Sequence, residues 1–227
     1  MEKLLDERVE QQVKEVFQSL RGDVALVFFG SQSQTCTYCE DAKLLVTEVA
    51  SLSDKLHLEL YELEKHPEES KKYQLDKAPS FLVASYDQGK IVDHGIRYLG
   101  IPAGHEFTSL IRDILMVSSG DSGLLPETRE FLAGLKSPIT LQVFVTPTCP
   151  YCPQAVVLAH QMAMESSMVA AEMVDAMEFP DLSAQHKVSG VPHTVINGGH
   201  AELVGAAPEQ YLVEKMQEAI SLSVSKN

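Results

Sequence analysis

The sequence predicts an α/β protein made of two similar halves, each with a central mixed sheet flanked by helices. Three observations indicate this fold class. All four cysteines occur as two Cys-x-x-Cys pairs, each pair is followed at one fixed distance by an X-Pro step, and both halves show the same order of elements. Cys36 and Pro79 are 43 residues apart, and so are Cys149 and Pro192. A repeated dithiol with a repeated proline indicates a duplicated redox domain.

The first half is predicted to alternate helices and strands. Residues 2–20 carry apolar side chains at helical spacing, which predicts an amphipathic helix. Residues 24–29 form a short apolar run, which predicts a buried strand leading into the first dithiol. After the dithiol we expect a helix, a strand over 56–63, a helix from Pro67 to Leu75, strands over 80–86 and 91–99, and a helix over 104–117.

The second half repeats this order. We expect a helix over 127–135, a strand over 139–145, a helix from the second dithiol to about 168, a strand over 169–174, a short helix over 180–186, two strands around the turn Asn197-Gly198-Gly199, and a final helix around Leu212 to Ile220. The small polar run from Ser118 to Gly123 reads as a linker. We therefore predict an N-terminal domain over 1–120 and a C-terminal domain over 121–227.

Composition narrows the possible functions. The chain has 227 residues, of which 44% are hydrophobic, and its net charge of −14 is divided evenly between the halves. No basic face is left for a phosphate backbone, so we expect no nucleic-acid binding. The charged start of the sequence and the lack of a long apolar stretch predict a cytoplasmic protein without a membrane span. In the cytoplasm, a Cys-x-x-Cys pair is more often catalytic or metal-binding than structural.

Each dithiol has the spacing that disulfide exchange needs. Cys36 and Cys149 follow a strand and stand where a helix opens, so unpaired backbone N–H groups and the helix dipole favour their thiolates. Cys39 and Cys152 lie three residues further on and can attack a mixed disulfide formed by the first cysteine. We therefore predict that Cys36 and Cys149 are nucleophiles and that Cys39 and Cys152 are resolving thiols.

The prolines complete the predicted sites. If each X-Pro bond is cis, the backbone of the residue before the proline can face the dithiol and pair with an extended substrate segment. The tyrosines inside the two motifs are expected at the rim of each site. The predicted substrate-binding residues are Ala78, Pro79, Val191, Pro192, Tyr38 and Tyr151. We expect His193 to shape the substrate surface and not to take part in the chemistry.

Both halves resemble thioredoxin-fold domains, and Cys149-Pro150-Tyr151-Cys152 is similar to the motif of glutaredoxins. The whole chain resembles the protein disulfide oxidoreductases of thermophilic archaea and bacteria; the segment 93–104 and Phe144-Val145-Thr146 also match. The resemblance implies two tandem thioredoxin-like folds that exchange dithiols and disulfides with protein substrates. It also implies an NADPH-dependent flavin reductase of the thioredoxin-reductase type as electron donor. From the spacing within each motif we predict local disulfides Cys36–Cys39 and Cys149–Cys152, and we expect no bound cofactor or metal.

One feature of thioredoxins is absent from the sequence. Thioredoxins carry a buried aspartate about six residues before the dithiol, which is thought to relay protons to the resolving thiol. Here Gly30 and Val143 occupy these positions. The carboxyls that could substitute are Glu62, Glu64, Asp175 and Glu178, and the sequence places none of them.

Other readings of the cysteines stay open. The two pairs could bind one zinc ion in a non-enzymatic protein, bridge chains through an iron–sulfur cluster, or form purely structural disulfides. The chain could also be an electron-transfer module for a peroxidase, similar to the paired thioredoxin folds of certain peroxiredoxin reductases. Those keep a dithiol in one fold only, so the presence of both dithiols favours a disulfide oxidoreductase.

Overall fold

The computed structural model describes residues 3–33 and 36–224. The first half contains α1 (Glu7–Phe17), β1 (Asp23–Gly30), α2 (Cys39–Ala50), β2 (Leu56–Glu62), α3 (Pro67–Tyr73), β3 (Ser80–Asp87), β4 (Lys90–Leu99) and α4 (Glu106–Ser119). The second half contains α5 (Pro126–Ala133), β5 (Ile139–Val145), α6 (Cys152–Glu165), β6 (Val169–Asp175), α7 (Pro180–Gln185), β7 (His193–Ile196), β8 (Ala201–Val204) and α8 (Glu209–Val224). The predicted order of elements is confirmed in both halves.

Helix ends differ from the predicted ones for local reasons. The first helix begins at Glu7 and not at residue 2, because the Asp6 side chain caps it by accepting the N–H of Val9 at 2.8 Å. Residues 1 and 2 lie outside the described residues. Helix α6 ends at Glu165, about three residues earlier than predicted, because Ser166 takes an extended conformation.

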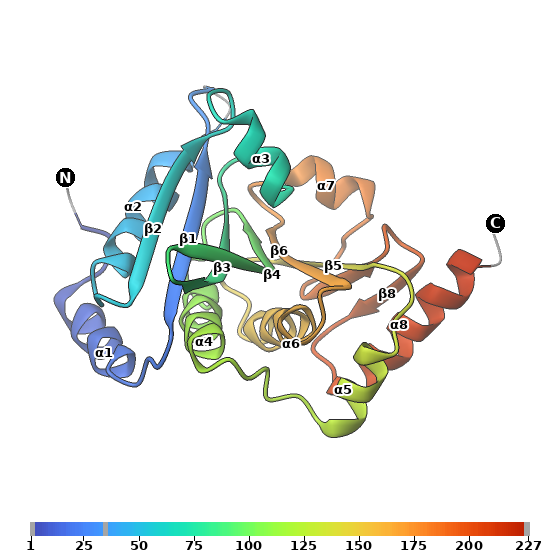
Figure 1. The fold of residues 1–227 in the computed structure, drawn as a ribbon. Helices are drawn as coiled ribbons and strands as arrows, with labels where there is room; N and C mark the ends of the chain where they lie inside the picture. The colour runs from blue at the N-terminus through green and yellow to red at the C-terminus, as the bar shows by residue number, and fades with distance from the viewer. Residues whose placement is uncertain (1–2, 34–35, 225–227) are drawn as a thin grey trace.

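The two halves share one eight-stranded sheet with the order β2-β1-β3-β4-β6-β5-β7-β8 (Figure 1). Each half contributes four strands in the same relative order, as a duplication requires. The halves are joined where β4 pairs in parallel with β6, from Ile96 opposite Ala171 to Leu99 opposite Val174. β4 and β6 would each be an edge strand in an isolated half. Their pairing therefore gives hydrogen-bond partners to backbone N–H and C=O groups that would otherwise be unpaired. The sequence predicted a sheet in each half but not this junction.

A close backbone approach marks the junction. Gly95 of β4 has a φ of +80°, and a Cβ atom there would lie 2.6 Å from the carbonyl oxygen of Val169. Glycine is the residue that tolerates both this conformation and this contact. The strands of the two halves can therefore meet only because residue 95 has no side chain.

Strand direction brings both dithiols to one edge of the sheet. β1 and β4 are both antiparallel to β3, and β4, β6 and β5 are parallel to one another. The C-terminal ends of β1 and β5, which lead into the dithiols, therefore lie at the same edge. β3 and β7, which follow Pro79 and Pro192, are antiparallel to β1 and β5 and begin at this edge.

Helices cover both faces of the sheet (Figure 1). One large hydrophobic core, formed with α1, α2, α4, α5, α6 and α8, runs continuously through both halves. Two smaller cores lie on the other face, one with Tyr73 at the end of α3 and one with Leu182 of α7. No helix in the described part of the chain has the length and apolar character that a bilayer span requires.

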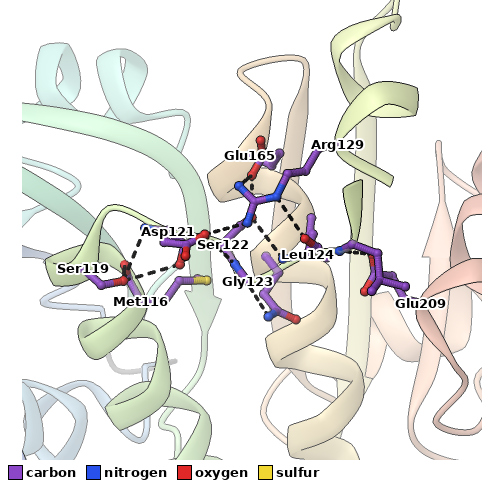
Figure 2. A network of polar contacts seen from close by, with 11 residues as sticks. Met116, Ser119, Asp121, Ser122, Gly123, Leu124, Arg129, Glu165 and Glu209 are labelled. Atoms are coloured by element: carbon purple, nitrogen blue, oxygen red, sulfur yellow. Dashed lines mark hydrogen bonds and ion pairs between the residues drawn. The ribbon is translucent and has the colours of Figure 1, made fainter. Parts of the chain in front are cut away.

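Polar contacts hold the predicted linker against the second half (Figure 2). The guanidinium of Arg129 lies 2.6 Å from Asp121 and 3.0 Å from Glu165. Ser122 donates its hydroxyl to Glu165, and its carbonyl accepts the side-chain amide of Gln161 at 2.7 Å. The linker is therefore a packed connection. The division of the chain at residue 120 stays our proposal.

Candidate redox sites

The second dithiol is a disulfide at the C-terminal end of β5. Cys149 and Cys152 are bonded to each other, with 5.5 Å between their Cα atoms. Helix α6 begins at Cys152, so Cys149 lies one turn before it. The N–H of Cys152 donates to Sγ of Cys149 at 3.1 Å. An N–H at a helix start is an orphan donor, and such a donor favours negative charge on the sulfur once the bond is reduced.

The first dithiol has a different surrounding. Cys36 and Cys39 form a disulfide, and α2 begins at Cys39. The sulfur that accepts a backbone N–H here is Sγ of Cys39, from Ser31 at 3.2 Å. Cys39 also lines a cavity of about 170 Å³ together with polar side chains that include Glu62 and His66. Gln34 and Thr35, in the loop before this dithiol, lie outside the described residues.

Both X-Pro bonds are cis. The N–H of Gly100 donates to the carbonyl of Pro79 at 2.9 Å, and Gly205 donates to Pro192 at 2.8 Å, so the two prolines hold matching places. Within the described residues, no backbone hydrogen bond engages Ala78 or Val191, the residues that precede these prolines. Pairing of this backbone with an extended substrate segment stays a prediction.

The two motif tyrosines and His193 differ in how far their side chains are exposed. Tyr38 and Tyr151 hold the N-cap positions of α2 and α6 and are 45% and 68% exposed. They can therefore contact a partner at the surface, and this role stays a prediction. His193 is buried in β7, where its Nε2 is 3.3 Å from Glu202 of β8.

A buried acid that sequence reasoning missed begins α4, at the edge of the sheet that carries the second dithiol. Glu106 is the first residue of α4, in the first half, and only 1% of its surface is exposed. The preceding residue, His105, donates its N–H to the carbonyl of Pro147, two residues before Cys149, at 3.0 Å. Helix α4 packs against α6, and both helices start at the dithiol edge. Glu106 and Cys152 are therefore the first residues of two helices that pack against each other.

Burial raises the pKa of Glu106 to about 7. Its Oε1 is buried and has no hydrogen-bond partner among the described residues. Nothing in the sequence near the dithiol points to this residue. An acid at the first position of a helix is common because the helix dipole favours it, so its position alone carried no signal.

The four carboxyls named from the sequence divide between the sites. Asp175 ends β6 opposite Val145 of β5, and Glu178 lies three residues further on. Burial raises the pKa of Asp175 and brings that of Glu178 to about 7. Hydrogen bonds from Lys65 and Ser31 lower the pKa values of Glu62 and Glu64 on the first side. Burial thus raises the carboxyl pKa values on the second side, whereas hydrogen bonds lower them on the first side.

The two dithiols cannot share one metal ion. β1 and β5 are four strand positions apart in the sheet, which places the sites about 19 Å apart. A zinc ion needs its sulfur ligands within about 2.3 Å. Among the described residues, no group of three or more His, Cys, Asp or Glu side chains is arranged to hold a metal ion. The distance between the two dithiols argues against one zinc ion bound by both Cys-x-x-Cys pairs.

Known proteins share this architecture. A family model described as a thioredoxin domain matches residues 139–218. A protein disulfide oxidoreductase from Aeropyrum pernix K1 superimposes with a TM-score of 0.87 and 29% identity, over 96% of each chain. The NTD_N/C domain of alkyl hydroperoxide reductase AhpF from Enterococcus faecalis superimposes with a TM-score of 0.83 and 29% identity, over 93% of this chain and 99% of that one. The chain is two thioredoxin folds in tandem.

This assignment confirms the predicted fold and the resemblance to protein disulfide oxidoreductases. The tandem thioredoxin folds carry two Cys-x-x-Cys sites in the setting of a thiol–disulfide oxidoreductase. A protein named NADH dehydrogenase in Bacillus subtilis is 25% identical over 195 residues, which are 86% of this chain and 35% of that protein. The chain spans about a third of the length of the curated relatives it matches.

Proposed function

We propose that the chain is a protein disulfide oxidoreductase that exchanges two electrons with protein substrates at each dithiol. The observation that carries the proposal is the repeated site: a disulfide at a helix start, an N–H donor on one of its sulfurs, and a cis-proline beside it. An extended substrate segment would pair with the free backbone of Val191 or Ala78, which brings its disulfide to the sulfur of Cys149 or Cys36.

The proposed reaction at the second site proceeds in two steps. The Cys149 thiolate attacks a substrate disulfide, which forms a mixed disulfide and releases one substrate thiolate that takes a proton. Cys152 then gives its proton to the Glu106 carboxylate and attacks Cys149, which forms Cys149–Cys152 and releases the second substrate thiolate. The substrate gains two electrons and two protons, and Glu106 afterwards returns its proton to water. Oxidation of a substrate dithiol is the reverse.

Electrons for the reduced form would come from a flavin reductase that uses a reduced nicotinamide. We propose NADPH as its donor from the resemblance to thioredoxin systems, and the name of the Bacillus subtilis relative supports NADH as the second candidate. The likeness to the AhpF domain also keeps a peroxidase-linked electron-transfer role as an alternative. The pair of intact dithiols favours a general disulfide oxidoreductase.

Reduction of insulin disulfides by dithiothreitol, with each site deleted in turn, tests the proposal. We expect full-length protein to accelerate the reaction, Cys36→Ser with Cys39→Ser to retain most of the activity, and Cys149→Ser with Cys152→Ser to lose most of it. The variant with all four substitutions should equal the uncatalysed rate. Activity that survives all four substitutions would overturn the proposal. An alkyl hydroperoxide peroxidase supplied as substrate tests the alternative, which requires the reduced protein to prefer it to insulin.

A further inference from the structure

The turn that follows β4 anchors the backbone next to the first dithiol. Gly100 is the first residue after β4, and Pro79 is the last residue before β3. The N–H of Gly100 donates to the carbonyl oxygen of Pro79 at 2.9 Å, which continues the pairing of β3 with β4 one step beyond Ser80 opposite Leu99. The place of this turn therefore fixes the backbone beside Ala78, the residue proposed to pair with a substrate.

Glu178, in the second half, holds this turn from its other side. Its Oε1 accepts the N–H of Ile101 at 2.8 Å. The pairing of β4 with β6 ends at Leu99 opposite Val174, and β6 itself ends one residue later. Beyond that point no strand of the second half continues beside Ile101. The Glu178 side chain thus supplies the acceptor that the backbone of a longer strand would supply.

The contact between Glu178 and the turn is tightly packed. Gly100 has a φ of +102°, and a Cβ atom there would lie 2.8 Å from Cβ of Asp175 and 3.0 Å from Oε1 of Glu178. Oδ1 of Asp175 accepts the N–H groups of Met177 at 2.8 Å and of Glu178 at 3.3 Å. Asp175 therefore fixes the backbone of Glu178, and the Ile101 N–H fixes its carboxyl group.

The corresponding turn beside the second dithiol has no such support. Gly205 donates its N–H to Pro192 at 2.8 Å and has a φ of +90°, but no atom of the described residues lies within 4 Å of its Cβ position. It follows β8, which is the last strand of the sheet, whereas β4 lies in the interior (Figure 1). Lys65 follows β2 as Glu178 follows β6, and it contacts Glu62 at 2.6 Å instead. The duplication therefore supports only the first turn.

We propose that Glu178 is a positioning residue of the first dithiol site, where it holds the turn at Gly100 and Ile101 and, through it, the backbone that pairs with an extended substrate segment. The inference rests on the proposed exchange reaction at that site. A segment that is already ordered binds with a smaller loss of conformational entropy. Removal of Glu178 should therefore weaken substrate binding at the first site without slowing the chemical step.

The test measures KM and kcat for insulin reduction by full-length protein that carries Cys149→Ser and Cys152→Ser, so that only the first site reacts. Glu178→Ala removes the acceptor, and we expect KM to rise about fivefold while kcat stays nearly unchanged. Glu178→Gln keeps an oxygen acceptor and should hold KM within about twofold of the parent value. Gly100→Ala should also raise KM, and adding it to Glu178→Ala should have little further effect, because both act on one turn.

The second dithiol supplies a matched control. In protein that carries Cys36→Ser and Cys39→Ser, Glu178→Ala should leave the KM of the second site unchanged. An unchanged KM at the first site, an equal rise at both sites, or the same rise with Glu178→Gln as with Glu178→Ala would each overturn the inference alone. If the first site shows no exchange while Glu178 is intact, the proposed function fails at that site and the inference fails with it.

A measurement on the unaltered chain covers the case in which Glu178→Ala does not fold. Hydrogen exchange of single backbone N–H groups, followed by NMR, reports whether each group is held in a hydrogen bond. We expect the N–H of Ile101 to exchange on the order of a hundredfold more slowly than in an unstructured peptide. Exchange of this N–H at the rate of an unstructured peptide would overturn the inference whatever the variants do.

Discussion

The backbone N–H of His105 donates to the carbonyl oxygen of Pro147 at 3.0 Å, which ties the start of α4 in the first half to the loop that presents the second dithiol. The next residue, Glu106, is the buried acid assigned to this site. The first half thus contacts the loop before the second dithiol, whereas the first dithiol has a cavity with polar walls beside Cys39. The duplicated sequence therefore builds two dithiol sites with different surroundings.

The contact between the halves can be tested at Gly104. Its φ is +59°, and a Cβ atom there would lie 2.2 Å from the carbonyl oxygen of Pro147. We expect Gly104→Ala to lower the unfolding free energy by about 2 kcal/mol or more and to slow exchange at the second site, because the loop before Cys149 must move.

Gly89→Ala is the matched control for this substitution. Gly89 also has a positive φ, of +82°, but no atom lies within 4 Å of its Cβ position. We expect Gly89→Ala to lower the unfolding free energy by about 1 kcal/mol through backbone strain alone. The rate of disulfide exchange at the second site should not change. Equal effects of the two substitutions on the exchange rate would contradict the assigned contact.

The two nucleophiles should differ in thiolate formation. Glu40 and Asp41 lie in the first turn of α2, where their charges repel a Cys36 thiolate, whereas the matching residues Pro153 and Gln154 are uncharged. We expect the Cys149 thiolate to form at lower pH than that of Cys36. Alkylation rates against pH, on variants that keep one dithiol each, measure this order. A lower apparent pKa at Cys36 would mean that these acids do not control the site.

The raised pKa of Glu106 should make the free energy of unfolding depend on pH. Its pKa is about 7 in the folded chain against 4.5 ordinarily, so the folded state holds a proton that the unfolded chain releases across this window. Stability therefore falls as pH rises from about 4.5 to 7, by about 2–3 kcal/mol from this group. Urea unfolding of wild type and Glu106→Gln at pH 5 and 7.5 should show a smaller decrease in the variant. Equal decreases would rule out a raised pKa at Glu106.

Arg129 should stabilise the linker. Its guanidinium contacts Asp121 and Glu165, and its Nε donates to the carbonyl of Leu124 at 2.9 Å (Figure 2). We expect Arg129→Ala to lower the thermal midpoint by a few degrees. Arg112→Ala removes an exposed arginine of α4 and should have little effect. If the two variants melt alike, the contacts drawn in Figure 2 do not hold the linker in solution.

Local patterns in the sequence predicted the elements but not their assembly. Helical spacing and short apolar runs identified all eight helices and eight strands of the described residues in order, and the 43-residue spacing located both dithiols and both cis-prolines. The β4–β6 junction depends on backbone contact between Gly95 and Val169, which periodicity does not register. Glu106 escaped prediction because it belongs to the other half, 43 residues before Cys149, where no motif marks it.

Trapping the mixed disulfide tests the central claim most directly. With Cys152→Ser, the second site can attack a substrate disulfide but cannot resolve the product. When this variant, which also carries Cys36→Ser and Cys39→Ser, is reduced and mixed with insulin, mass spectrometry should find one insulin chain bound to Cys149. Cys149→Ser in the same background should trap nothing. Failure to form the Cys149 adduct under conditions in which the wild type reduces insulin would contradict the account.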